Sequence, residues 1–149
     1  MQPVRPTSPF KECRVPHINY LAVLVAGVVI FVLGGLWYSP VMFAKKWMAL
    51  QGRGAEDMSG GGNMAAMYLQ VFICGLLTAW VMAILIEFLP VFDMMRSVHL
   101  AILCWLGFTA ATSYGTSMFS MKPKALWAID TGFNLVSFVI AAVILAAWR

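Results

Sequence analysis

Four long apolar runs, separated by short segments rich in charge, glycine or proline, set the pattern of this chain. They cover about residues 18–38, 64–89, 98–119 and 125–148. At about 1.5 Å per residue, an α-helix of roughly 20 residues crosses the roughly 30 Å hydrocarbon core of a bilayer. Each run reaches that length, so the pattern predicts four transmembrane helices.

The segments between the runs predict turns, a linker and a tail. Pro40 ends the first run, and residues 41–50, with two lysines beside a tryptophan, are typical of a short interfacial helix. Residues 51–63 contain five glycines and predict a flexible linker, because a phosphate loop would need a GK[ST] motif and a preceding strand. Residues 1–17 contain four prolines and predict a flexible tail.

Short connections predict an all-α integral membrane bundle of four transmembrane helices with up-down topology and both termini on the same side. Lys and Arg number three in the tail, one in the second loop and one at the C-terminus, which makes five on that side. The first and third loops carry three and two, also five. The positive-inside rule is therefore tied. We favour cytoplasmic first and third loops because the charges of the tail are dispersed.

The composition agrees with a lipid environment. Hydrophobic residues make up 62% of the 149 positions and charged residues 11%, whereas a soluble domain is about half apolar and about a quarter charged. The net charge of +4 comes from basic residues that occur singly or in pairs, without the basic stripe of a nucleic-acid-binding surface. We therefore expect contact with the lipid bilayer and no nucleic-acid partner.

Neither the cysteines nor the histidines have the spacing of a metal site. Cys13, Cys74 and Cys104 share no CxxC motif, and no ligands cluster near His17 or His99. The two histidines would lie at the same membrane surface. Ligation of a haem or pigment by this pair is the alternative, and the colour of the purified protein tests it. We expect no metal and no cofactor.

Polar side chains inside the apolar runs gather at one depth. From the side of the first and third loops, the helical rise places Asp130 about 8 Å inside, Gln70 about 9 Å and Asn134 about 14 Å. Asp130, Asn134 and Ser137 also fall on one helix face. An unpaired polar group in hydrocarbon is costly, so this face should turn away from lipid. The predicted polar cluster consists of Asp130, Asn134, Gln70, Tyr114, Thr116 and Tyr38.

Two interpretations of Asp130 are open at this point. An acid about five residues inside a span can be an interfacial residue that reaches water or pairs with the nearby Lys124. Alternatively, the acid can form a site together with the neighbouring amides, since an intramembrane acid is able to bind a proton or a cation.

Small residues form two further patterns. Gly107, Ala111 and Gly115 recur at every fourth position of the third run, and Gly27 and Gly34 share one face of the first. Small residues let two transmembrane helices approach closely, so both patterns predict helix packing. Three threonines lie nearly opposite the ladder of the third run, which makes this helix a candidate for the bundle centre or for a bridge to another subunit.

One group of motifs runs through nearly the whole chain. It comprises Asn19-Tyr20-Leu21-Ala22-Val23, Trp37-Tyr38-Ser39-Pro40 with Phe43 and Trp47, Gly107-Phe108, Phe119, and Asp130 before Gly132-Phe133. This pattern resembles the uncharacterised bacterial membrane family called domain of unknown function 1761. The resemblance implies a four-helix, multi-pass protein of the bacterial inner membrane, and it implies no activity and no catalytic residue.

These patterns lead to two functional expectations. The first is a non-enzymatic membrane protein, either a homo-oligomer or an accessory subunit of a larger membrane complex, that packs through its small-residue faces. The alternative is a small carrier or channel for a proton, a cation or a small polar solute at Asp130 and Asn134, which would require a dimer because four helices are few for a pathway. An enzyme is not expected, because the sequence has no HExxH motif and no nucleophile–base pair.

Overall fold

The computed structural model describes residues 17–52, 63–89 and 93–148 of the chain, and all regular secondary structure in these ranges is helical. The predicted all-α class is therefore confirmed. Four helices are long and apolar enough to cross a membrane. They are Tyr20–Trp37, Met64–Phe88, Met94–Phe119 and Lys124–Ala147. The chain is thus a multi-pass membrane protein with a helical bundle.

The third crossing is built from three helical segments, whereas each of the other crossings is a single α-helix. A π-helix, η1, interrupts the third crossing between α4 and α5. A short additional helix, α2, lies between the first two crossings. The elements in order are α1 (Tyr20–Trp37), α2 (Ala44–Gln51), α3 (Met64–Phe88), α4 (Met94–Cys104), η1 (Trp105–Ala110), α5 (Ala111–Phe119) and α6 (Lys124–Ala147).

Asparagine caps set where two of the long helices begin. The side chain of Asn19 accepts hydrogen bonds of 3.1 Å from the backbone N–H groups of Leu21 and Ala22. Asn63 caps α3 in the same way, with bonds of 3.1 and 3.3 Å from the second and third residues that follow it. These bonds satisfy N–H groups that have no partner inside the helix.

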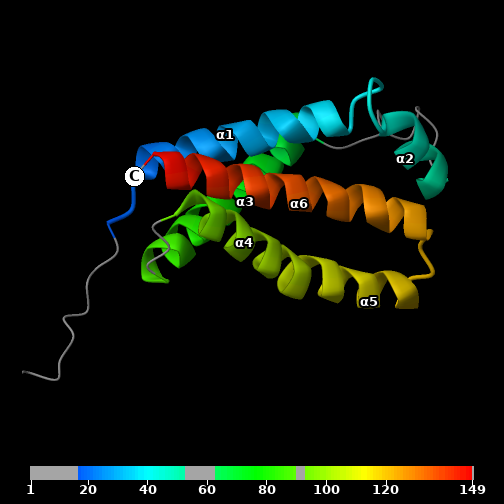
Figure 1. Cartoon of the computed structure of the whole chain (residues 1–149). Helices are drawn as coiled ribbons and strands as arrows, with labels where there is room; N and C mark the ends of the chain where they lie inside the picture. Colours follow the sequence, from blue (N-terminus) through cyan, green and yellow to red (C-terminus); the bar gives the residue numbers. More distant parts are fainter. Residues whose placement is uncertain (1–16, 53–62, 90–92, 149) are drawn as a thin grey trace, which may run out of the picture.

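The start of the first crossing and the end of the fourth come together at one end of the bundle. The Asn19 side chain donates a 3.3 Å hydrogen bond to the carbonyl oxygen of Trp148. Figure 1 shows the start of α1 beside the end of α6. The predicted up-down topology, with both termini on the same side, therefore agrees with the fold.

Small residues allow the helices at the bundle core to approach closely. Fully buried alanines at positions 22, 26, 79, 141 and 142 come from α1, α3 and α6. A Cβ atom at Gly27 would lie 3.2 Å from the Cα atom of Leu76, and one at Gly75 would lie 3.2 Å from the Ile30 side chain. The backbones of α1 and α3 therefore pack almost directly on each other.

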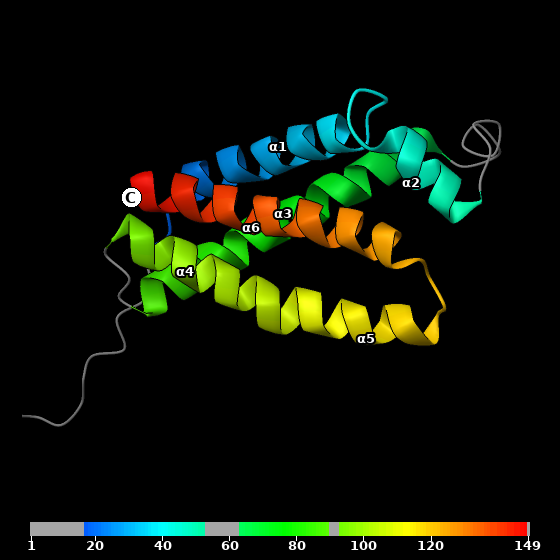
Figure 2. The ribbon, with the colours of Figure 1, turned by 45° about the vertical axis from the view of Figure 1, so that its right-hand side comes forward.

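The fourth crossing, α6, is the central helix of the bundle. In both ribbon views it lies between α1 on one side and α4, η1 and α5 on the other, while α3 crosses behind it (Figures 1 and 2). Towards the end of the bundle that carries α2, α3 and α5 diverge (Figures 1 and 2). α5 packs against α6 and η1 there, and this arrangement positions the site described below.

The helix boundaries refine the predicted spans by a few residues. The third crossing begins at Met94, whereas the hydropathy pattern places its start near residue 98. We predicted that the flexible linker begins at residue 51. Gln51 is instead the last residue of α2, and Gly52, with a φ of 66°, is the C-cap of that helix. Residues 1–16 of the predicted tail and 53–62 of the linker lie outside the described ranges.

Candidate functional site: a polar pocket at Asp130

Asp130 on α6 is held by two aromatic side chains from other parts of the chain. The hydroxyl of Tyr38 and the indole Nε1–H of Trp47 each donate a 2.9 Å hydrogen bond to its carboxylate. Both bonds end on the same oxygen, Oδ1. In the described part of the chain the partners of Asp130 are therefore neutral, and the predicted ion pair with Lys124 is not among them.

A compact turn after α1 brings these donors to Asp130. The Ser39 hydroxyl donates a 2.6 Å bond to the carbonyl of Leu36, and the Phe43 N–H donates a 3.2 Å bond to the carbonyl of Trp37. The chain thereby folds back, and α2 packs against α6. The predicted short helix at residues 41–50 is thus present as α2, and its Trp47 points towards Asp130 on α6.

The two donors to Asp130, Tyr38 and Trp47, belong to a group of five aromatic residues that pack on one another. The ring centroids of Trp37 and Phe43 are 5.0 Å apart, those of Tyr38 and Trp47 are 5.4 Å apart, and those of Tyr38 and Phe133 are 5.6 Å apart. Such tilted and edge-to-face pairs are favourable arrangements of aromatic rings. We call this group the aromatic cap, and it consists of Trp37, Tyr38, Phe43, Trp47 and Phe133.

Tyr38 acts as a donor to Asp130 because its phenol stays protonated. It lies one residue beyond the first membrane-spanning helix. Burial of the ring, together with the charge of Asp130 and the hydrogen bond to it, raises the pKa of the Tyr38 phenol above its ordinary value. A neutral phenol donates to a carboxylate, so the observed geometry is the stable one.

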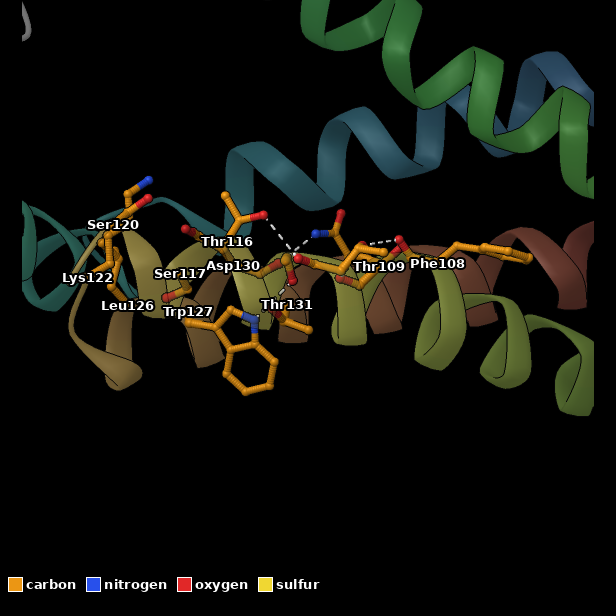
Figure 3. Close-up of a pocket in the computed structure, with 13 residues that line it drawn as sticks. Phe108, Thr109, Thr116, Ser117, Ser120, Lys122, Leu126, Trp127, Asp130 and Thr131 are labelled. Atoms are coloured by element: carbon orange, nitrogen blue, oxygen red, sulfur yellow. Dashed lines mark hydrogen bonds between the residues drawn. The ribbon is translucent and has the colours of Figure 1, made fainter.

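Asp130 also lines a pocket of about 410 Å³ between α6 and the η1–α5 part of the third crossing. Figure 3 shows the side chains that surround it. Its wall is rich in hydroxyl groups, with an acid and an amide on α6 and a lysine at the turn before α6. The polar lining residues are Thr109, Thr112, Ser113, Thr116, Ser117, Ser120, Lys122, Asp130, Thr131 and Asn134.

Several polar groups of this pocket direct their hydrogens into helix backbone. Thr112 donates to the carbonyl of Phe108, and Thr116 donates a 3.1 Å bond to the carbonyl of Thr112. The amide Nδ2 of Asn134 donates a 3.0 Å bond to the carbonyl of Asp130. The oxygen atoms of these side chains keep lone pairs for other partners. Around Asp130, the pocket is therefore rich in acceptors.

A second, more apolar pocket of about 260 Å³ adjoins the first. It lies between α1, α3 and α6, and Asn134 lines both pockets. Aromatic rings of Phe31, Phe133 and Phe138 form much of its wall. Asn134 thus marks the boundary between a polar pocket on the α5 side of α6 and an apolar pocket on the α3 side.

Three tryptophans, one of them Trp37 of the aromatic cap, form hydrogen bonds that hold α6 in place at the level of Asp130. The indole N–H of Trp37 donates a 3.2 Å bond to the carbonyl of Ile129, and that of Trp105 donates a 2.9 Å bond to the carbonyl of Thr131. Trp127 donates a 3.0 Å bond to the hydroxyl of Ser113. The peptide groups on both sides of Asp130 are therefore anchored to other helices, and its carboxylate has a defined position.

The fold brings together four of the six members of the predicted polar cluster. Asp130, Asn134 and Thr116 line the polar pocket, and Tyr38 is bonded to Asp130. Gln70 lines the second pocket together with Asn134, at the α3 side of the same cleft. The sequence placed these residues in the same half of the membrane, so depth predicts part of this neighbourhood.

Tyr114 is the member of the predicted cluster that lies elsewhere. It lines neither pocket, and its ring packs edge-to-face on Trp127 with a centroid distance of 5.0 Å. Trp47 and Trp127, in contrast, belong to the site and were not predicted to do so. The available signal for Trp47 was its place in a short interfacial helix directly after the first span, on the membrane side from which Asp130 is reached.

The two predicted small-residue patterns lie in different surroundings. A Cβ atom at Gly27 would meet α3, and one at Gly34 would lie 3.4 Å from the ring of Phe133. Gly107, Ala111 and Gly115 are exposed, and a Cβ atom at either glycine would meet nothing within 4 Å. The wider π-helical turn at Gly107 also shifts it relative to the α-helical pair Ala111 and Gly115.

No group of three or more His, Cys, Asp or Glu side chains that could hold a metal ion occurs in the part of the chain that the structure describes. Cys74 is exposed and lines the second pocket, and Cys104 is buried. The chemistry available at the polar pocket is therefore that of one carboxylate, one amide, one lysine, several hydroxyls and aromatic rings. Such groups bind and orient a ligand through hydrogen bonds and charge.

The model of one protein family, described as a protein of unknown function (DUF1761), matches residues 21–146. The chain belongs to this family. No curated protein and no solved structure gives a match. All five residues of the aromatic cap, and Asp130 itself, are part of the motifs by which the sequence resembles the family. The fold assembles these separate motifs at one place.

Proposed function

We propose that this chain is a non-enzymatic protein of the bacterial inner membrane that binds a small polar solute or cation at Asp130, as a subunit of a carrier or channel. The observation that supports this most directly is the pocket of about 410 Å³ beside a carboxylate whose partners, within the described ranges, are neutral. The bacterial inner membrane is inferred from the resemblance of the motifs to a family of prokaryotic type.

The position of Asp130 in a membrane-spanning helix supports a ligand. It is the seventh residue of α6, which begins at Lys124. On insertion scales, a charged side chain at the centre of a transmembrane helix costs about 2.5–3.5 kcal/mol, and such groups commonly mark binding sites. The bonds from Tyr38 and Trp47 offset part of this cost, and a cation or a hydrogen-bond donor in the pocket would offset more.

A transport pathway would require a second copy of the chain or another membrane subunit. Four helices are few to enclose a pathway for a solute. The proposal therefore includes assembly with a second copy or another subunit. The exposed ladder of Gly107, Ala111 and Gly115 provides a surface for it, because small residues permit close helix contact. This surface lies on the third crossing, whose other side lines the polar pocket.

The second candidate function is a purely structural one. The chain would be a homo-oligomer or an accessory subunit of a larger membrane complex, without a solute of its own. The observation that favours it is the same exposed ladder, since no part of the described chain lies within 4 Å of a Cβ atom placed at Gly107 or Gly115. In that case the polar pocket would be a packing defect filled with water.

The two proposed functions are distinguished by testing whether the binding of small molecules to the protein requires Asp130. The purified protein is placed in lipid nanodiscs, and its melting temperature is measured with methylammonium, sodium or glycerol at increasing concentration. We expect at least one probe to raise the melting temperature of the wild type and to have no effect on Asp130→Asn. In this variant the amide oxygen still accepts bonds from Tyr38 and Trp47, so the fold should persist.

Glu87→Gln is the matched control, because it removes an acid near the opposite end of the bundle, in a different pocket. It should respond to the probe as the wild type does. If no probe stabilises the wild type, or if Asp130→Asn responds equally, the solute-binding proposal fails and the structural function is favoured. Uptake of the same probe into proteoliposomes then separates a carrier or channel from a protein that only binds.

A further inference from the structure

We infer that the ligand of the Asp130 pocket is an amphiphilic organic amine, with its ammonium group at Asp130 and its hydrocarbon part in the second pocket. This inference rests on the proposed function and names the class of ligand for it. It comes from three properties of the cleft: the acceptor-rich wall at Asp130, the size of the polar pocket and the apolar pocket that adjoins it.

The acceptor-rich wall selects a ligand that donates hydrogen bonds. Thr112 and Thr116 use their hydrogens on backbone carbonyls, so in the pocket that they line with Asp130 their oxygen atoms are acceptors. The carboxylate of Asp130 has two neutral partners on one oxygen. An ammonium group has several donors and no acceptor, and its bonds to a carboxylate are charge-assisted and strong. It therefore complements this wall.

Within the described ranges, no basic side chain forms a hydrogen bond with the Asp130 carboxylate. Lys122 lines the pocket at the turn before α6, eight positions from Asp130, and it is exposed. Its ammonium group can remain in water, as long basic side chains do near membrane surfaces. The negative charge inside the span thus keeps a preference for a cation, and the aromatic ring of Trp127 adds a face on which a cation can rest.

The size of the polar pocket favours an organic cation over a bare metal ion. A volume of about 410 Å³ would hold on the order of a dozen water molecules at about 30 Å³ each. A hard metal cation needs several oxygen ligands at about 2.0–2.6 Å, usually with more than one carboxylate. The pocket has one carboxylate, so a larger cation with its own volume fits it better.

The second pocket can accept hydrocarbon at low cost. Its polar groups are the amides of Gln70 and Asn134 and two hydroxyls. Both hydroxyls are already satisfied inside their helices, because Thr78 donates a 3.0 Å bond to the carbonyl of Cys74 and Ser137 donates a 2.9 Å bond to the carbonyl of Phe133. An apolar chain in this pocket would therefore leave these donors paired. The rings of Phe31 and Phe138 would contact it.

The two pockets share Asn134 on α6, and this placement allows one ligand to occupy both. α3 and α5 diverge at this end of the bundle (Figures 1 and 2), and the two pockets meet at Asn134 on the face of α6 between them. Apolar side chains on the outer surface, such as Phe108 and Leu77, are exposed and would contact lipid.

The test uses a twelve-carbon primary amine with a photoreactive diazirine in its chain, and the corresponding alcohol as the uncharged control. The protein in nanodiscs is irradiated with each probe, and the labelled positions are mapped by mass spectrometry. We expect the amine to label α3 near Cys74 and α6 near Phe138 in the wild type. In Asp130→Asn we expect labelling at these positions to fall by about tenfold or more, because the charge-assisted bond to the carboxylate is lost.

A second pair of variants separates the two pockets. Cys74→Phe fills the apolar pocket, whereas Leu77→Phe adds the same ring to an exposed position outside it. We expect Cys74→Phe to lose the labelling near Phe138 and to keep stabilisation by methylammonium, which needs only the polar pocket. Leu77→Phe should retain both responses.

Failure of this inference differs from failure of the proposed function. If methylammonium binding needs Asp130 but the amine and the alcohol label α3 and α6 equally, the pocket takes small cations and the amphiphile is excluded. If none of methylammonium, sodium and glycerol stabilises the wild type and no site is labelled, the proposed function fails as well. Labelling that occurs only in monomeric fractions would show that a second copy fills the cleft, and this also overturns the inference.

Discussion

The Tyr38 hydroxyl donates a 2.9 Å hydrogen bond to the Asp130 carboxylate across 92 positions of sequence. This bond joins the end of the first crossing to the inner part of the fourth. Trp47 donates to the same carboxylate oxygen, so the acid is held by two donors that arrive on one compact turn. The Asp130 carboxylate therefore has a fixed position in the wall of the polar pocket.

The first prediction concerns these two donors. Tyr38→Phe and Trp47→Phe each remove a hydrogen bond to a charged group, and we expect each to lower the free energy of unfolding by about 1–3 kcal/mol. Because both bonds end on one oxygen, the effects should not add, and a double-mutant cycle should show coupling. Thermal or denaturant unfolding in nanodiscs measures this. Tyr20→Phe, at an exposed ring, is the control.

The second prediction concerns the contact of α1 with α3. Gly27→Ala would place a Cβ atom 3.2 Å from the Cα atom of Leu76, where backbone must move. We expect a loss of stability of about 1–3 kcal/mol, as for other overpacked cores. Gly35→Ala should be neutral or slightly stabilising, since a Cβ atom there meets nothing within 4 Å. Equal melting temperatures of the two variants would contradict the close packing.

The third prediction concerns the exposed ladder. Replacing Gly107, Ala111 and Gly115 by Leu adds volume where the described chain has room, so we expect the monomer to fold normally. Assembly through this surface should be lost, because bulky side chains hold helices apart. Native mass in mild detergent measures the oligomeric state. An unchanged mass, together with unchanged folding, would remove the ladder as an assembly surface.

The fourth prediction separates binding from folding at the hydroxyl wall. Thr116→Val keeps the shape of the side chain and removes an oxygen acceptor from the polar pocket. We expect methylammonium affinity to fall by roughly twofold to tenfold, which corresponds to a hydrogen bond of about 0.5–1.5 kcal/mol. Stability without a ligand should change little, because the hydroxyl is bonded to its own helix. Thr78→Val, in the apolar pocket, should leave this affinity unchanged.

Hydropathy was sufficient to predict the four crossings and the arrangement of the termini. The depth of each polar group along its helix also follows from sequence, because the rise per residue is constant. This is why Asp130, Asn134, Thr116 and Tyr38 could be placed together. The position of a residue along its helix predicts which other residues lie at the same level of the membrane. This prediction requires no knowledge of helix rotation.

Rotation and loop geometry could not be predicted in the same way. Tyr114 has the expected depth, but it packs on Trp127 outside both pockets. A helix that is apolar around most of its circumference gives little periodic signal for its orientation. The contact of Trp47 with Asp130 depends on the path of the turn after α1, and the π-helix at Trp105–Ala110 has no sequence signal that we recognise.

The central claim is that Asp130 binds a cation or donor inside the membrane. Equilibrium dialysis of radiolabelled methylammonium against the protein in nanodiscs tests it most directly, with wild type, Asp130→Asn and Glu87→Gln compared at equal concentration. We predict saturable binding of about one methylammonium per chain for wild type and Glu87→Gln, and none for Asp130→Asn. Equal binding by all three proteins, or no saturable binding to the wild type, would contradict the claim.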